Sequence, residues 1–230
     1  NIKLINADST GAIDMSAVTT ITSSSTSDVL EIVNNTNAAF TTANNYAVTL
    51  SDTASAANAN TIMNDTAGIV TATVTATGAV ADLNTALANA TANDALTLVL
   101  NATSASAADL NTLNGKTSVN INAATIETIT SSTADDVNTA VTNKTAIGLD
   151  GDWDVTLSDT TLSAAEVKTI NAGTSGTINM AAATTISSSS ISDILEIVNN
   201  TGAAFTTHAD YAVTLSDTTA SAANIKLINA

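Results

Sequence analysis

The chain has 230 residues and a net charge of −16, which arises from 21 acidic residues against five lysines, and it contains no arginine and no cysteine. An acidic surface without basic patches excludes nucleic acid as a partner, because phosphate contacts need Lys or Arg. The lack of cysteine excludes disulfides and thiolate metal sites. Since only 2% of the residues are aromatic, the core must be packed from Ala, Val, Ile and Leu.

The sequence contains a long internal repeat. Residues Ile2–Thr53 align without a gap onto Val167–Thr218, with 36 of 52 positions identical. Inside this long copy lies a shorter unit of about 28 residues, which is within the range of known repeat families. We therefore expect residues 1–230 to form one array of about eight such units. The chain opens and closes on NIKLINA, which indicates an excerpt of a longer chain.

Each short unit carries a motif that predicts a helix of about two turns. A hydroxyl residue is followed three positions later by Asp, Glu or Asn and then by apolar residues three apart, which is the pattern of a helix N-cap. The motifs begin at Ser25, Ser55, Ser106, Thr133, Ser163, Ser190 and Ser221, and an eighth has Ala79 in the first position. Closing Asn residues such as Asn34 and Asn199 predict left-handed C-caps, a conformation that Asn tolerates.

Between the helices lie segments that alternate in hydrophobicity and are rich in β-branched residues, as strands are. They begin at Ile13, Val48, Ile69, Leu96, Val119, Val155, Ile178 and Val213. Three units add a second alternating piece, TTITSSS, IETITSS or TTISSSS.

One strand and one short helix per unit predict a β-solenoid with short helices, in which successive coils stack their strands in parallel. The coil length is similar to that of leucine-rich repeats. The alternative is a row of antiparallel β-sandwich modules with Thr-rich strands, although such modules have no need of a capped helix in every unit.

The segment DGDWD is the densest group of carboxylates and the candidate metal site. Asp150, Asp152 and Asp154 stand at alternate positions, as acids do in calcium loops, and they are the predicted calcium ligands. The Gly and Glu of a helix-loop-helix calcium loop are replaced here by Val155 and Thr161. A solvated turn before the next strand is therefore the competing interpretation.

Three further aspartates follow the phrase VTLS at one point of the repeat, namely Asp52, Asp159 and Asp217. They are candidates for a column of carboxylates bridged by calcium, and local turn formation is the simpler explanation. His208 is the only histidine, and its counterpart in the first long copy is Ala43. A catalytic base is not expected in one copy alone, so we predict no catalytic residues and no enzyme activity.

Two groups of side chains are candidates for binding. Threonines at strand spacing in Thr71–Thr77 resemble the flat arrays of ice-binding proteins, but the neighbouring segments do not continue them in sequence. Phe40 and Phe205 stand at equivalent positions and serve either to anchor a loop or to stack on carbohydrate.

The phrase VTLSDTTxSAAxI, embedded in Ala/Thr/Asn/Ser-rich coils, resembles the repetitive regions of giant bacterial cell-surface proteins, such as adhesin stalks and S-layer-like coats. The resemblance implies a structural rod at the bacterial cell surface, extracellular and often associated with calcium. We expect the partners to be neighbouring repeats or identical chains end to end, with a glycan or surface protein as further possibilities and no membrane insertion. The alternative function is a binding module for glycan, a partner protein or ice.

Overall fold

The structure is a computed structural model that describes residues 8, 11–34, 39–199 and 204–229. The chain divides into two compact units. Unit 1 comprises residues 1–101 and 112–122, and unit 2 comprises residues 102–111 and 123–230. The division passes through helix α5 (Ala107–Asn114), so this helix contributes residues to both units.

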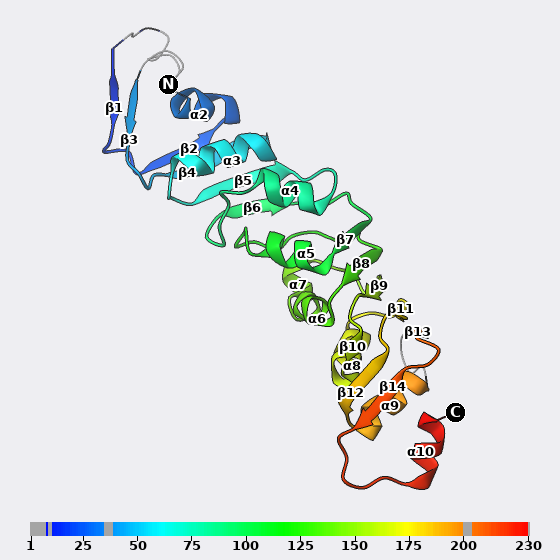
Figure 1. Cartoon of the computed structure of the whole chain (residues 1–230). Coiled ribbons are helices and arrows are strands. Elements are labelled where there is room, and N and C mark those ends of the chain that lie inside the picture. Colours follow the sequence, from blue (N-terminus) through cyan, green and yellow to red (C-terminus); the bar gives the residue numbers. More distant parts are fainter. Residues whose placement is uncertain (1–7, 9–10, 35–38, 200–203, 230) are drawn as a thin grey trace. The chain divides into compact units, whose positions relative to one another are not determined.

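Unit 1 contains two parallel sheets and three helices of its own (Figure 1). The strands are β1 (Ile13–Met15), β2 (Thr20–Ser24), β3 (Phe40–Thr42), β4 (Ala47–Ser55), β5 (Val70–Thr75) and β6 (Ala95–Leu98). The helices are α2 (Thr26–Val33), α3 (Ala56–Asp65) and α4 (Val80–Ala86). One sheet has the order β1-β3 and the other the order β2-β4-β5-β6.

Unit 2 also contains two parallel sheets, with the orders β13-β11-β9-β8-β7 and β10-β12-β14. The strands are β7 (Ser104–Ser106), β8 (Thr128–Ser132), β9 (Asp154–Leu157), β10 (Thr161–Leu162), β11 (Ile178–Met180), β12 (Thr185–Ser189), β13 (Phe205–Thr207) and β14 (Ala212–Leu215). The helices are α6 (Ala134–Thr142), α7 (Lys144–Ile147), α8 (Ala164–Gly173), α9 (Ile191–Val198) and α10 (Ala222–Ile228).

The prediction of a single β-solenoid is wrong. The protein is a mixed α/β protein whose strands belong to four separate parallel sheets, of two, four, five and three strands, with nine helices in the described residues. It is therefore not a repeat solenoid, whose coils would share one wall of strands. Every strand pairing in the described part of the chain is parallel, so the alternative of antiparallel sandwich modules is not observed either.

The strands are short, and several of their pairings are irregular. The register shifts in the pairing of β2 with β4, of β8 with β9 and of β12 with β14. Within two of these strands, Ser23 and Ser188 have positive φ angles of 47° and 43°. A residue in this left-handed region bends the strand and interrupts pairing. The segments TITSS of β2 and TISSS of β12 did not reveal this in the sequence, because a hydroxyl residue between polar neighbours is equally typical of a straight edge strand.

The predicted helices are confirmed at all eight motifs, and each spans 7 to 10 residues. A hydroxyl side chain caps the third helical N–H in most of them, and Ser163 with Glu166 forms a complete capping box. None of the helices in the described residues has the length and hydrophobicity needed to cross a membrane.

The predicted left-handed Asn caps are wrong. Asn34 and Asn199 both have φ of −84°, and the N–H of each donates to two carbonyls of the preceding turn. The last turn therefore satisfies its own carbonyl groups, and no reversal of the backbone is required.

Alternation within the strands places small and branched side chains in the interior. In β5, Ala72 and Val74 are buried while Thr71 and Thr73 are exposed. Seven of the eight predicted strand segments contain a strand, whereas the segment at Val119 contributes only an isolated bridge between Asn122 and Val99. The core thus consists of aliphatic residues, as the composition requires.

Candidate functional site

The aspartates that follow VTLS are helix caps for the preceding repeat. The Asp52 carboxylate accepts hydrogen bonds from the Thr26 backbone N–H and hydroxyl, both at 2.8 Å, at the start of α2. Asp159 accepts from the Ala134 N–H at 2.8 Å, and Asp217 accepts from the Ile191 N–H at 2.7 Å. In each case a carboxylate accepts a hydrogen bond from the first N–H of a helix that begins 25 or 26 residues earlier. Its negative charge also interacts favourably with the positive end of the helix dipole.

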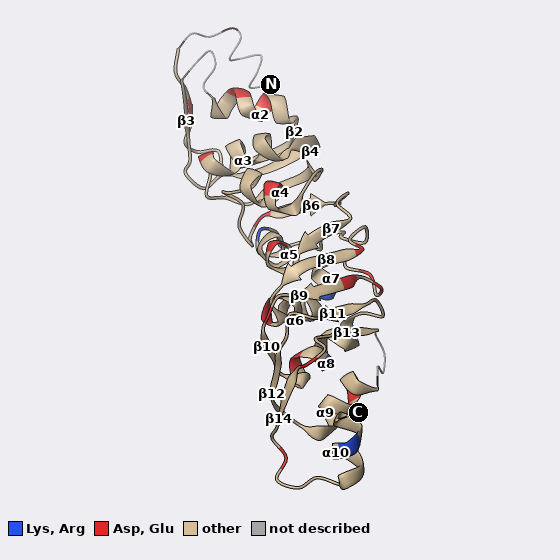
Figure 2. Cartoon of the chain, turned by 45° about the vertical axis from the view of Figure 1, so that its right-hand side comes forward, with Lys and Arg blue, Asp and Glu red and all other residues tan. Residues whose placement is uncertain are grey.

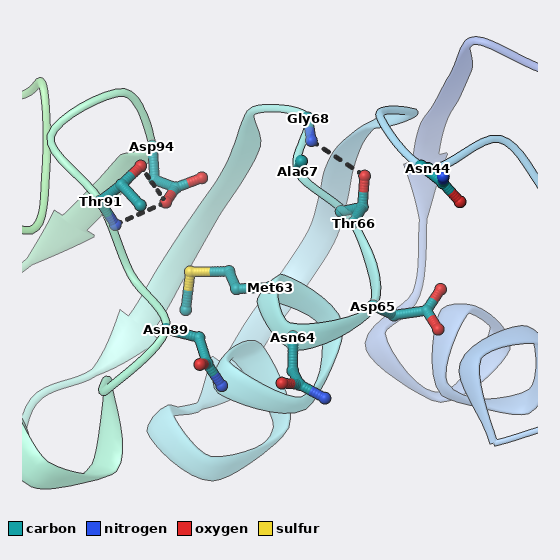
Figure 3. Close-up of a pocket in the computed structure, with 10 residues that line it drawn as sticks. All are labelled: Asn44, Met63, Asn64, Asp65, Thr66, Ala67, Gly68, Asn89, Thr91 and Asp94. Atoms are coloured by element: carbon teal, nitrogen blue, oxygen red, sulfur yellow. Dashed lines mark hydrogen bonds between the residues drawn. The ribbon is translucent and has the colours of Figure 1, made fainter.

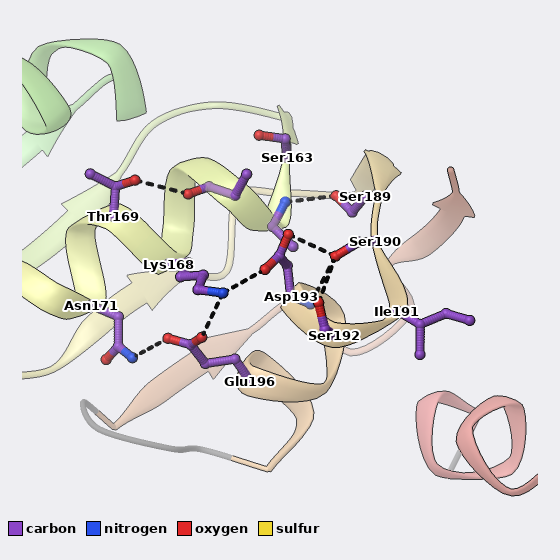
Figure 4. Close-up of polar contacts among 12 residues, drawn as sticks. Ser163, Lys168, Thr169, Asn171, Ser189, Ser190, Ile191, Ser192, Asp193 and Glu196 are labelled. Atoms are coloured by element: carbon purple, nitrogen blue, oxygen red, sulfur yellow. Dashed lines mark hydrogen bonds and ion pairs between the residues drawn. The ribbon is translucent and has the colours of Figure 1, made fainter. Parts of the chain in front are cut away.

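Two serines play the same part in the repeats that lack this aspartate. Ser132 accepts from the Ala107 N–H at 2.9 Å, and Ser189 accepts from the Ala164 N–H at 2.7 Å (Figure 4). Sequence reasoning missed these residues. The available signal was their recurrence at the end of the segments TITSS and TISSS, one residue before the N-cap of the next helix.

The hydrogen bonds to Asp52 also affect its acidity. Hydrogen bonds from the Thr26 backbone and side chain hold the pKa of Asp52 below its ordinary value. A carboxylate stabilised by two donors in the folded state is harder to protonate than one in the unfolded chain. Folding is therefore linked to ionisation of this group.

A lysine connects two successive helices of unit 2. The Lys168 ammonium lies 2.8 Å from Asp193 Oδ1 and 3.8 Å from Glu196 Oε2, while Asn171 donates to Glu196 Oε1 at 2.7 Å (Figure 4). The hydrogen bond with Lys168 lowers the pKa of Asp193 and raises that of the lysine. Because the Lys168 side chain is 51% exposed, solvent screening makes this ion pair only weakly stabilising.

Two buried threonines clamp the strand of the preceding repeat. Thr66 donates its hydroxyl to the carbonyl of Tyr46 at 2.6 Å, and Thr174 donates to the carbonyl of Trp153 at 2.6 Å. Each hydroxyl also accepts from the N–H of a glycine two residues later, Gly68 or Gly176, at 3.0 Å. We call this Thr-x-Gly arrangement with its aromatic partner the clamp.

The clamp requires glycine because the two backbones approach closely. A Cβ atom on Gly68 would lie 2.4 Å from the carbonyl oxygen of Tyr46, and one on Gly176 would lie 2.4 Å from that of Trp153. Such distances are well inside van der Waals contact with rigid backbone. The glycine therefore sets how closely two repeats pack.

Tyr46 and Trp153 are the largest fully buried side chains and hold equivalent places in their repeats. The Tyr46 hydroxyl donates to Asp65 Oδ2 at 2.6 Å. Burial, and then the hydrogen bond to Asp65, raise the pKa of the Tyr46 phenol well above its usual value. Asp65 also lines the pocket described next.

A polar pocket of about 440 Å³ lies in unit 1 beside the clamp (Figure 3). Its lining is Asn44, Met63, Asn64, Asp65, Thr66, Ala67, Gly68, Asn89, Thr91 and Asp94. Asp94 is almost completely buried, and its carboxylate accepts from the N–H groups of Val70 and Thr91 at 2.8 Å and from the Thr91 hydroxyl at 3.1 Å. Its oxygens thus hold the start of β5 and its own turn together.

Of the three predicted calcium ligands, Asp150 and Asp152 lie before β9 and Asp154 is the first residue of that strand. Asp152 and Asp154 are exposed, and Asp154 Oδ1 accepts from the Thr177 N–H at 2.6 Å. Asp150 Oδ1 is buried and makes no hydrogen bond in the structure. Among the residues that the structure describes, no group of three or more His, Cys, Asp or Glu side chains is placed to hold a metal ion. The calcium site at these residues stays a prediction.

The remaining candidates are dispersed. His208 accepts from the Asp210 N–H at 3.1 Å through Nδ1, within a turn. Phe40 and Phe205 are half-buried on β3 and β13, opposite Ile13 and Ile178 respectively. Residues 35–38 and 200–203, which precede them in the sequence, lie outside the described residues.

The threonine face of β5 extends further than its own sequence indicates. Thr73 lies opposite Thr53 on β4 and opposite Thr97 on β6, and all three are exposed. Parallel register therefore assembles a row of three threonines from segments that do not resemble one another.

Comparison with models of known protein families finds none that matches this chain, and no match is found among curated proteins or solved structures either.

Proposed function

We propose that this chain is a structural, non-enzymatic segment of an extracellular assembly, such as a cell-surface stalk, coat or filament. The observation that carries the proposal is the capping of helices by the following repeat, illustrated by Asp52 on Thr26, Asp159 on Ala134 and Asp217 on Ile191. Polar side chains at recurring positions thus form hydrogen bonds that connect one repeat to the next.

The remaining polar contacts between repeats support the same role. The clamp threonines, the lysine that joins α8 to α9 and the buried Asp94 all connect segments about 20 to 30 residues apart. Acidic residues are distributed over both units and lysines are few (Figure 2). Such a surface stays hydrated and resists non-specific association, which suits a protein exposed to the surroundings of a cell.

Protease resistance under native conditions tests the proposal, because cleavage reports the population of opened states. We expect a non-specific protease to digest the wild-type chain slowly, and Asp159→Ala to be digested several-fold faster because α6 loses its cap. Glu127→Ala is the matched control, since Glu127 is exposed on the neighbouring segment and caps no helix start. Rapid internal cleavage of the wild-type chain, or equal rates for the two variants, would contradict the proposal.

A second candidate function is surface binding, which the row Thr53, Thr73 and Thr97 favours. Exposed hydroxyls and methyl groups on neighbouring strands offer a regular face to ice or glycan. Inhibition of ice recrystallisation by the wild-type chain, reduced by Thr73→Lys and retained by Thr85→Lys on the exposed side of α4, would support this role. No inhibition by the wild-type chain would exclude ice as the ligand.

A further inference from the structure

The polar pocket of unit 1 is formed by three segments from successive repeats. One segment precedes β4, residues 63–68 end α3 and lead to β5, and residues 89–94 lead to β6. The volume of about 440 Å³ lies within the range of small-molecule sites, roughly 300–1,000 Å³. Figure 3 shows Asp94 on one side of the pocket, Asp65 on the other and Met63 between them. The pocket thus has the size and the enclosure of a ligand site.

Several polar groups of the lining are left without a partner by the fold. The side-chain amides of Asn44, Asn64 and Asn89 make no hydrogen bond within the described residues. Tyr46 donates to Oδ2 of Asp65, and Oδ1 of the same carboxylate has no partner in that part of the chain. Each amide offers both N–H donors and a carbonyl acceptor. The lining therefore presents donors and acceptors together.

Packing of the repeats does not account for these side chains. In unit 2 the clamp forms with Ala172 in the place of Asn64. Gly173 there takes the place of Asp65, and the buried Trp153 has no acceptor for its Nε1. A clamp with a buried aromatic residue therefore needs neither the amide nor the carboxylate, so both are available for another role in unit 1.

The charge of the lining limits what can bind. The lining contains two carboxylates and no lysine, and it includes Asp65 at the C-terminal end of α3, where the helix dipole is negative. Anions are therefore disfavoured. A metal ion is disfavoured too, because Asp65 and Asp94 lie on opposite sides (Figure 3) and no group of three His, Cys, Asp or Glu side chains in the described residues is placed to hold one. Any cation would also leave the amide N–H donors unused.

We propose that this pocket binds a neutral saccharide unit. A hydroxyl group both donates and accepts, so it can donate to Asp65 Oδ1 while it accepts from the amides of Asn64 and Asn89. The Met63 side chain, which is 6% exposed, gives the C–H face of a sugar ring an adaptable apolar surface. The site is separate from the row of threonines on β4, β5 and β6. It adds an activity to the proposed structural role and does not depend on that role.

Calorimetric titration of the wild-type chain tests the proposal. The neutral probes are the methyl glycosides of glucose, galactose, mannose, N-acetylglucosamine and N-acetylgalactosamine. Glucuronic acid, spermidine and calcium chloride are the charged probes. We expect at least one neutral glycoside to bind and to bind more tightly than any charged probe. Asn64→Ala and Asn89→Ala should each weaken that binding about tenfold, because each removes a hydrogen-bonding amide from the lining.

Asn58→Ala is the matched control, since Asn58 is exposed on the same helix as Asn64 and does not line the pocket. This variant should keep the wild-type affinity, and so should Thr73→Lys, which alters the threonine row. Thermal melting of Asn64→Ala should match that of Asn58→Ala, which separates lost binding from lost folding.

Three results would overturn the proposal. They are the absence of binding by every neutral glycoside, tighter binding of spermidine or calcium than of any glycoside, and an equal loss of affinity in Asn58→Ala and Asn64→Ala. The structural role would stand after any of them, because protease resistance tests it independently.

Discussion

The carboxylate of Asp159 accepts a hydrogen bond of 2.8 Å from the backbone N–H of Ala134, which begins a helix 25 residues earlier. The helix thus carries two caps, because its own Thr133 hydroxyl accepts from the Asp136 N–H at 3.2 Å. One cap is local and visible in the sequence, and the other comes from the next repeat.

Removing the distant cap is expected to destabilise unit 2. Asp159→Ala should lower the free energy of unfolding by about 1 kcal/mol, because the Ala134 N–H loses its acceptor. Asp159→Asn keeps an oxygen acceptor and should cost less. Urea unfolding followed by circular dichroism measures both values. Glu127→Ala should stay within about 0.5 kcal/mol of the wild-type chain, and an equally large loss there would contradict the capping explanation.

Lowering the pH is expected to destabilise unit 1, because Asp52 becomes protonated. The pKa of Asp52 is lowered on folding, so the stabilisation it provides is complete above the pKa of the unfolded state and is lost as the pH falls through the folded value. Unfolding midpoints measured from pH 7 down to pH 2 should therefore decrease in the acidic range. Asp52→Asn should show a smaller decrease, and identical pH profiles for the two proteins would argue against this linkage.

The clamp glycines are expected to tolerate no side chain. Gly176→Ala brings a Cβ atom to 2.4 Å from the Trp153 carbonyl oxygen and should destabilise the protein by about 1–3 kcal/mol or more. Gly151→Ala is the matched control, since its Cβ would meet only the Lys144 ammonium at 3.7 Å. Thermal melting of the two variants compares their stability. Similar midpoints would contradict the prediction, because they would show that the backbones at Gly176 and Trp153 can move apart without loss of stability.

Loss of the Tyr46 hydroxyl is expected to leave a carboxylate without its donor. Tyr46→Phe removes the 2.6 Å bond to Asp65 and should cost about 1–2 kcal/mol of unfolding free energy. Tyr211→Phe changes the equivalent but half-exposed residue and should have a much smaller effect. Titration of tyrosine absorbance adds a second measurement, because the wild-type chain should contain a phenol whose pKa is raised and Tyr46→Phe should lack it.

Calcium is tested separately from the hydrogen bond that Asp154 makes. Asp154→Ala should lower the melting midpoint with and without calcium, because the Thr177 N–H loses its acceptor. Asp152→Asn changes an exposed candidate ligand that has no such bond in the structure. A midpoint that rises with calcium in the wild-type chain and not in Asp152→Asn would establish the predicted site. Equal midpoints with calcium and with a chelator would remove it.

The sequence by itself determined the local elements of this protein. The motif at Ser163 carries its own cap and apolar spacing, so α8 follows from contacts within about ten residues. Alternation around Thr73 likewise determines which side of β5 is buried. Composition determined an aliphatic core, because few large aromatic side chains exist to fill one.

The tertiary structure decided which strands share a sheet and what the recurring polar residues do. Whether Asp159 forms a turn, binds a metal or caps a helix depends on where Ala134 lies, and no pattern within one repeat encodes that separation. The division into four sheets depends on which strands of different repeats pair, such as Thr185 of β12 with Ala212 of β14. Short-range preferences act along the chain, whereas these contacts join residues that become neighbours only after folding.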